Sequence, residues 1–469
     1  MFQLVSRAAF WSIGSITISR IVFYLTSIFV LALLTPAEFA SVAIAISFYQ
    51  GINIFLAIGM EARALSMTDS NERYRAYPTL FYLELLRGGA VSLVVVFASF
   101  HDHFASYESL PEALRWIGLS SVIFSLKNPS LVESKFRMNM APVFYCEVSQ
   151  SIVSASVVIF GILLTGDALY FTIGYFCGAV AYVLLSYLVL PRISLNRFDG
   201  RTAKTFFVFG GWLSFSSALN ALIEHGVTIM VSFFNRPALV STFERSDFLL
   251  RKSTLQVGEI GWRVLLPLFS KVDMSSQSGL KVFYASKAVL MTLGTIVASV
   301  AAIWGPTIVG KYFESWSPLL DSVMLFLVIG LISLATTVNS IYFQAHRVPS
   351  YESCLQLLRV FIVGGGFGYV WLGYAELSLF NLAMILLYGI VFYAIASHVF
   401  LSRLVSVRFW VFICPEILAV TALGVFGCAG SLPFWELFIA TSICILIHAL
   451  LLVYLLKLLR IHLAQLELL

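Results

Sequence analysis

Residues 142–164 read PVFYCEVSQSIVSASVVIFGILL, and residues 168–190 read ALYFTIGYFCGAVAYVLLSYLVL. The first run contains one charged residue, Glu147, and the second contains none. Each run is long enough to cross the hydrocarbon core of a bilayer, which takes about 20 apolar residues in a helix. A short polar linker around Gly166 separates them. This stretch therefore predicts two consecutive membrane-spanning helices.

The composition of the whole chain agrees with this pair of helices. Of 469 residues, 60% are hydrophobic and 11% are charged, whereas average soluble proteins contain about 25% charged residues. So few charges cannot cover the surface of a soluble protein of this size. The composition excludes a disordered chain, a disulfide-rich secreted domain and an ordinary soluble enzyme. The net charge of +5 does not indicate nucleic acid, because the basic residues follow a membrane topology.

Apolar runs and the breakers between them divide the chain into predicted spans. We expect an all-α, polytopic membrane protein with about 14 transmembrane helices of bilayer-spanning length. The short connections leave no room for a soluble domain. The predicted spans are 11–34, 38–60, 78–100, 112–131, 142–164, 168–190, 205–232, 247–270, 285–304, 319–344, 353–374, 379–402, 411–429 and 434–456.

The distribution of basic residues predicts the orientation. With the N-terminus inside, 19 of the 29 Lys and Arg residues fall in inside segments, and Lys287 is counted among them. Three fall outside: Arg236, Arg245 and Lys311. Lys and Arg are enriched in cytoplasmic loops, so we expect both termini to be cytoplasmic.

An internal repeat divides the predicted spans into two halves. A shift of 201 residues superposes Trp11 on Trp212, Ser15 on Ser216 and Pro36 on Pro237. Spans 1 and 7 both begin inside, as parallel repeats of a secondary transporter do. We therefore expect two six-helix lobes, residues 1–200 and 201–403, followed by two further helices in 404–469. The alternative is a chance coincidence of residue types that are common in membranes.

Ionisable side chains inside the predicted spans are candidates for function, because they are costly in a bilayer. They include Glu84 and Arg87, three residues apart, and a one-sided charged stripe in 244–263 that is net positive. Arg and Lys recognise phosphate, so a phosphate-bearing substrate is expected. The alternatives are internal ion pairs, such as Glu84 with Arg87, and a segment 244–252 that lies outside the bilayer. The predicted substrate-binding residues are Arg20, Arg87, Arg251, Lys252 and Arg263.

Several local patterns resemble catalytic or cofactor sites only superficially. Residues 305–312 match a P-loop except at Tyr312, where Mg²⁺ coordination needs Ser or Thr. Glycines 364–368 favour close helix packing. His101 and His103 lack a third ligand for a metal, and the six cysteines show no C-x-x-C spacing. We expect no catalytic residue, no metal and no cofactor.

Four motifs resemble those of polysaccharide transporters, the O-antigen flippase family of the multidrug/oligosaccharidyl-lipid/polysaccharide flippase superfamily. Leu33-Leu34-Thr35-Pro36-Ala37-Glu38-Phe39 resembles the family's L-L-x-P-x-(E/D)-(F/Y)-G, with Ala40 in place of glycine. Ile58-Gly59-Met60 resembles a D-x-G-L element in which Ala57 replaces the acidic residue. Residues 204–210 resemble the F-G that opens the seventh span, and residues 310–318 resemble a G-x-x-W-x-x-A segment.

The resemblance implies a flippase in the bacterial cytoplasmic (inner) membrane. Its substrate would be an undecaprenyl-diphosphate-linked oligosaccharide for O-antigen, capsule or exopolysaccharide, moved by alternating access. Membrane lipid and other polysaccharide-assembly proteins are further candidate partners; nucleic acid is not. Coupling to H⁺ or Na⁺ would use Glu84, Glu147, Glu224 or His225. The alternatives are a multidrug/cation antiporter of the same superfamily, and a polymerase, ligase or acyltransferase of polysaccharide assembly.

Overall fold

The regular structure of this chain is helical throughout the part that can be described. The computed structural model describes residues 2–57, 64, 70–105, 107, 109–191, 198–234, 236–269, 276–345, 349–405 and 448. Within these ranges no strand occurs. Contacts between helices divide the chain into two compact units, which we call unit 1 (Met1–Ser241) and unit 2 (Thr242–Leu469). The predicted all-α fold is confirmed.

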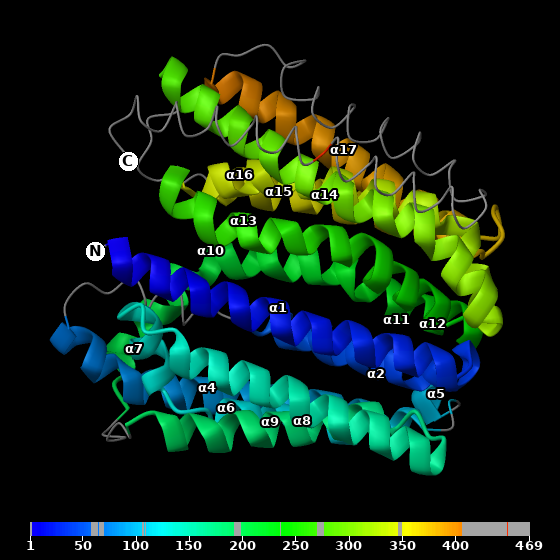
Figure 1. Ribbon diagram of the computed structural model, residues 1–469, viewed down its shortest axis with the longest axis horizontal. Coiled ribbons are helices and arrows are strands. Elements are labelled where there is room, and N and C mark those ends of the chain that lie inside the picture. The colour runs from blue at the N-terminus through cyan, green and yellow to red at the C-terminus, as the bar shows by residue number, and fades with distance from the viewer. Residues whose placement is uncertain are drawn as a thin grey trace. The chain divides into compact units, whose positions relative to one another are not determined.

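Unit 1 contains the first run of helices (Figure 1). They are α1 (Phe2–Leu33), α2 (Pro36–Phe55), α4 (Ser70–Ala98), α5 (Asp102–Ala105), α6 (Leu110–Ser125), α7 (Ser130–Phe136), α8 (Ala141–Thr165), α9 (Tyr170–Val189), α10 (Gly200–Glu224) and α11 (Gly226–Ser232). Helix α12 (Pro237–Ser246) crosses the boundary between the units.

Unit 2 continues from α12 without a break in helical structure. It contains the π-helix η1 (Asp247–Lys252), α13 (Ser253–Phe269), α14 (Gln277–Tyr312), the 3₁₀ helix η2 (Glu314–Ser322), α15 (Val323–Ala345), α16 (Pro349–Trp371) and α17 (Leu379–Val405). Helix α15 packs against α13, α14 and α17, so it forms the centre of the described part of this unit.

The two apolar runs at residues 142–164 and 168–190 form the helical pair α8 and α9. Helix α8 ends at Thr165 and is capped by Gly166, whose φ of 72° is a left-handed conformation that glycine adopts without strain. The helices then pack closely: a Cβ atom on Gly174 would lie 2.8 Å from the backbone oxygen of Ser154. Small residues therefore allow the backbones to approach, as is usual between membrane helices.

Nine helical segments of the described residues are long and apolar enough to cross a membrane. They correspond to predicted spans 1–3, 5, 6 and 9–12. Predicted span 4 forms the 16-residue helix α6. Span 7 is divided into α10 and α11, and span 8 contains η1 and α13. Spans 411–429 and 434–456 lie outside the described residues, and the total of 14 stays a prediction.

The motif at residues 33–39 is a helix start. Thr35 is the N-cap of α2 and Pro36 is its first residue. The backbone N–H of Thr35 donates to Glu38 Oε2 at 2.7 Å, and the N–H of Glu38 donates to Thr35 Oγ1 at 3.5 Å. This reciprocal capping box satisfies two backbone donors at the start of the helix. The T-P-x-E pattern is thus explained by helix capping.

The glycine-rich patterns of unit 2 lie inside helices. Residues 305–312 belong to α14, so they do not form a phosphate-binding loop. Gly366 of α16 faces α17, where an added Cβ would lie 2.8 Å from the side chain of Ile385. The expected packing role is confirmed for this glycine. The predicted lobe boundaries stay a prediction, and α10 packs against α2 and α4 in unit 1.

Candidate functional site

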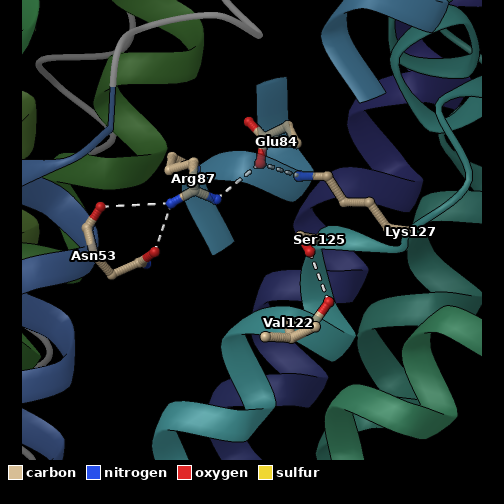
Figure 2. Close-up of polar contacts among 6 residues, drawn as sticks. All are labelled: Asn53, Glu84, Arg87, Val122, Ser125 and Lys127. Carbon is tan, nitrogen blue, oxygen red and sulfur yellow. Dashed lines mark hydrogen bonds and ion pairs between the residues drawn. The ribbon is translucent and has the colours of Figure 1, made fainter. Parts of the chain in front are cut away.

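A charged triad inside unit 1 consists of Glu84 and Arg87 on α4 and Lys127 in the loop after α6 (Figure 2). Arg87 Nη2 donates to Glu84 Oε2 at 2.8 Å. Lys127 Nζ lies 4.0 Å from the same oxygen. Arg87 Nη1 also donates to Asn53 Oδ1 on α2 at 2.5 Å. One carboxylate therefore lies between two cations that come from different elements.

Close packing between α4 and α6 brings the triad together. A Cβ on Gly88, next to Arg87, would lie 2.7 Å from the backbone oxygen of Ser121 on α6. The loop that carries Lys127 is fixed by its neighbour Asn128, whose side chain is fully buried. Asn128 Nδ2 donates to the backbone oxygens of Ser186 at 3.3 Å and Pro191 at 3.2 Å. These bonds hold the loop against the C-terminal end of α9.

The triad is accessible and carries a net charge of +1. The exposed fractions of the side chains are 13% for Glu84, 18% for Arg87 and 22% for Lys127. Glu84 and Lys127 also line a small pocket together with Phe81, Ser125 and other residues of α4, α6 and α7. Three of the five guanidinium hydrogens of Arg87 are used on Asn53 and Glu84. The remaining donors and the ammonium group of Lys127 can bind an anion.

The predicted pairing of Glu84 with Arg87 is confirmed, but pairing does not neutralise the site. The spacing indicates this pair, because residues three apart share one helix face. It does not indicate Lys127 or Asn53, for which no site was predicted. Nothing in the sequence indicates that an inner-loop lysine lies beside a carboxylate of α4. Their placement depends on the packing of α2, α4 and α6.

Another predicted residue, Glu147, lies at the interface between α1 and α8. The hydroxyl group of Ser15 on α1 donates to Glu147 Oε2 on α8. Trp11 packs edge-on against Phe144, with ring centroids 5.0 Å apart, and helps to fix the two helices. Arg20 lies further along α1 and is half-buried. The roles of Arg20 in substrate binding and of Glu147 in ion coupling stay predictions.

Glu224 and His225 lie at a break in predicted span 7. Helix α10 ends at Glu224, α11 begins at Gly226, and His225 is the residue between them. The side chain of His225 is 4% exposed, and its Cβ is 3.5 Å from the position of a Cβ on Gly51 of α2. Broken helices expose polar backbone groups at membrane depth, and transporters use such sites to bind ions and substrates. The coupling role of both residues stays a prediction.

The predicted cations of unit 2 form a second triad with Asp247. Arg251 donates to Asp247 through Nε and also through Nη2, the latter at 2.8 Å, and Lys252 Nζ lies 3.5 Å from Asp247 Oδ2. All three belong to the π-helix η1, a type of element that often marks functional sites. Arg251 is 3% exposed and Lys252 is 26% exposed. The side chain of Arg263 lies outside the described residues.

Lys287 is not in an inner loop, where the sequence predicted it. Its side chain lies fully buried on α14, and Nζ is 2.9 Å from His398 Nε2. His398 had no predicted role. Among the residues that the structure describes, no group of three His, Cys, Asp or Glu side chains is placed to hold a metal ion.

More than half of the chain matches one known protein family. Residues 30–320, more than half of the sequence, match the polysaccharide biosynthesis protein family. The chain belongs to this family. A sequence comparison with curated proteins finds no match. This member of the polysaccharide biosynthesis protein family contains both triads within the matched residues.

The fold of this polysaccharide biosynthesis protein is that of MOP-superfamily transporters. A multidrug resistance MATE family transporter in an inward-facing conformation is 14% identical, with a TM-score of 0.64 over 88% of this chain and 99% of that chain. Lipid II flippase MurJ in an inward closed conformation is 12% identical, with a TM-score of 0.58 over 94% and 98% of the two chains. The chain is therefore a multi-pass membrane protein with a transporter fold.

Proposed function

We propose that this protein moves an undecaprenyl-diphosphate-linked oligosaccharide across the bacterial cytoplasmic membrane by alternating access, as a transporter and not as an enzyme. The observation that carries the proposal is the accessible triad of Glu84, Arg87 and Lys127, which has a net charge of +1. An arginine binds phosphate oxygens through two parallel hydrogen bonds, and a lysine adds a point charge. A diphosphate headgroup fits both groups.

Three further observations support this substrate class. The chain belongs to a polysaccharide biosynthesis family. Its fold is shared with a protein described as a lipid II flippase. Unit 2 also holds two cations, Arg251 and Lys252, against one carboxylate. A transporter of organic cations would instead need sites that are net negative, so the multidrug alternative is disfavoured.

Binding of undecaprenyl diphosphate to the purified protein in lipid nanodiscs tests the proposal. Arg87→Gln and Lys127→Gln should each weaken binding about tenfold or more, because a hydrogen bond to a charged group contributes about 1.5–3 kcal/mol. Arg201→Gln, at an exposed position of α10, is the matched control and should bind as the wild type does.

A cellular assay follows the transport step. Cells that carry Arg87→Gln should accumulate the lipid-linked oligosaccharide on the cytoplasmic leaflet and lose surface polysaccharide. Normal surface polysaccharide in cells that contain Arg87→Gln and Lys127→Gln together, at normal protein levels, would contradict the assignment of the triad. Export of a cationic dye by the wild type would instead support the antiporter function.

A further inference from the structure

The turn between α7 and α8 in unit 1 contains a strained backbone conformation. Among the residues that the structure describes, Met138 is the only one other than glycine with a positive φ, which is 56°. This left-handed conformation is unfavourable for a residue with a bulky side chain and is open to glycine. The side chain of Met138 is 45% exposed. Packing inside the protein therefore does not explain why a methionine stands at this position.

Backbone hydrogen bonds form this turn, which we call the Schellman turn and which spans Ser134–Asn139. The N–H of Asn139 donates to the backbone oxygen of Ser134 at 2.9 Å, and the N–H of Met138 donates to that of Lys135 at 3.0 Å. These two bonds are the Schellman pattern that ends a helix, in which the left-handed residue is usually glycine. Ser134 Oγ also donates to the backbone oxygen of Asn139 at 2.5 Å. The turn thus needs no side chain at position 138 in order to form.

Apolar and basic side chains alternate along the Schellman turn. Phe136 is 37% exposed and Met138 is 45% exposed. Lys135 is half-buried, and the side chain of Arg137 is 62% exposed. Exposed apolar side chains beside basic ones are typical of segments that lie at the boundary between lipid headgroups and acyl chains.

The Schellman turn lies directly before a candidate membrane span. Helix α8 begins at Ala141, and the span that it forms also begins at this residue. The headgroup region adds about 5–8 Å on each side of the hydrocarbon core of a bilayer. A turn that ends two residues before the span therefore lies at the depth of the headgroups, in the cytoplasmic leaflet according to the predicted topology.

Arg137 is held in position and still has hydrogen-bond donors for a ligand. Its Nε donates to Glu133 Oε1 at 2.5 Å, and its Nη2 donates to the hydroxyl of Tyr74 at 2.7 Å. Glu133 is buried and accepts a second bond, from Tyr77, at 2.5 Å. These bonds join α7 to the start of α4 at one end of unit 1 (Figure 1). Since a guanidinium group has five N–H donors, three remain, and an arginine binds phosphate oxygens through two of them at once.

We propose that the Schellman turn binds the headgroup of an anionic phospholipid, with Arg137 on the phosphate and with Phe136 and Met138 in the apolar boundary beneath it. Helix α7 and the turn contain two basic residues and one acidic residue, so their net charge of +1 is complementary to an anionic lipid. The lipid also explains the methionine, because contact with acyl chains offsets the cost of its left-handed backbone. This site is separate from the triad of Glu84, Arg87 and Lys127, and it does not depend on the transported substrate.

Native mass spectrometry of the full-length protein measures the binding of phosphatidylglycerol, with zwitterionic phosphatidylcholine as the reference lipid. The wild type should bind phosphatidylglycerol more tightly. Arg137→Gln should lower this affinity about fivefold, the usual effect of one basic residue at an anionic lipid surface. Lys311→Gln removes an exposed basic residue of α14 and is the matched control. Equal affinity of the wild type and Arg137→Gln for phosphatidylglycerol would overturn the inference.

Three substitutions of Met138 separate lipid binding from folding. Met138→Gly removes the backbone strain, so its melting temperature in detergent should equal or exceed that of the wild type, while its affinity for phosphatidylglycerol should fall. Met138→Asn should also bind the lipid more weakly, because asparagine tolerates the left-handed conformation but is polar. Met138→Leu keeps an apolar side chain and should keep the affinity. A lower melting temperature of Met138→Gly with unchanged lipid affinity would assign the methionine to packing and overturn the inference.

Photo-crosslinking in cells identifies what contacts the turn. A benzophenone amino acid in place of Met138 should form adducts with the mass of a phospholipid. Adducts with a soluble protein in place of lipid would overturn the inference and indicate a protein partner. Because none of these measurements contains a lipid-linked oligosaccharide, failure of the proposed transport function would leave their results unchanged.

Discussion

At the scale of single residues, two carboxylates are each shared by two cations. Glu84 lies between Arg87 and Lys127, and Asp247 lies between Arg251 and Lys252. In both groups one acidic side chain reduces the cost of two cations without cancelling their charge. A charge away from water is costly, so each carboxylate offsets part of the cost of its two cations.

Removal of the Glu84 charge should separate stability from binding. Glu84→Gln raises the net charge of the triad from +1 to +2, so we expect tighter binding of undecaprenyl diphosphate with a steeper salt dependence, because surface charges are screened by salt. The melting temperature in detergent should fall by a few degrees, since the ion pair with Arg87 is lost. Glu112→Gln removes the same charge at an exposed position of α6 and serves as the control. Weaker binding by Glu84→Gln with an intact fold would show that the carboxylate itself contacts the ligand or a cation.

His103, outside the candidate membrane spans, should make stability depend on pH. Its ring stacks on Phe233 at 4.3 Å between centroids, and burial, with a smaller effect of His101, lowers the pKa of His103 below its ordinary value of 6.5. The unfolded chain therefore binds a proton first as the pH falls, so the stabilisation is complete above about pH 6.5 and is lost below it. We expect His103→Phe to melt with less pH dependence than the wild type between pH 7.5 and pH 5.5. His101→Gln removes only the smaller cause and should have a smaller effect; equal slopes for wild type and His103→Phe would refute the assignment.

At the scale of elements, the positions of helix starts and of close contacts explain the local sequence. Thr35 and Glu38 form a capping box at the start of α2, which carries Asn53 at the triad. Gly88 lets α4 approach α6, and Gly174 lets α9 approach α8. Capping residues and small residues thus have direct local consequences for where a helix begins and how closely it packs.

Adjacent glycines on α4 allow a controlled test of helix packing. A Cβ at Gly88 would lie 2.6 Å from Ser125 Cβ and 2.7 Å from the backbone oxygen of Ser121, whereas a Cβ at Gly89 meets no atom within 4 Å. We expect Gly88→Ala to destabilise the protein by about 1–3 kcal/mol, as overpacking does, and to weaken binding at the triad. Gly89→Ala should leave stability unchanged or raise it by up to about 1 kcal/mol through its higher helix propensity. Thermal unfolding in detergent compares the two variants, and an equal effect at both positions would contradict the described packing of α4 on α6.

At the scale of the whole molecule, the chain is a helical membrane protein made of two compact units. Each unit contains one triad of two cations and one carboxylate, and unit 2 also contains the buried Lys287–His398 pair. The chain belongs to the polysaccharide biosynthesis protein family and shares its fold with MOP-superfamily transporters.

The orientation in the membrane can be tested with introduced cysteines. Asp167 lies exposed between α8 and α9, and Met138 lies exposed between α7 and α8. With a cytoplasmic N-terminus, we expect Asp167→Cys to react with a membrane-impermeant maleimide in intact cells, and Met138→Cys to react only after permeabilisation. The unchanged chain gives the background from its six native cysteines. The reverse pattern of labelling would contradict the predicted topology.

The sequence by itself determined the helical membrane fold, and it offered the pairing of Glu84 with Arg87 as one of two alternatives. These features depend on hydrophobic length and on neighbours within one helix, which are local properties of a chain. Only the tertiary structure decided that Lys127 and Asn53 join the triad and that Lys287 contacts His398. The last contact joins residues 111 positions apart on two helices, and the sequence does not show which faces of those helices meet. Packing between helices, and not the count of charges in loops, therefore decides which basic residues are held inside this protein.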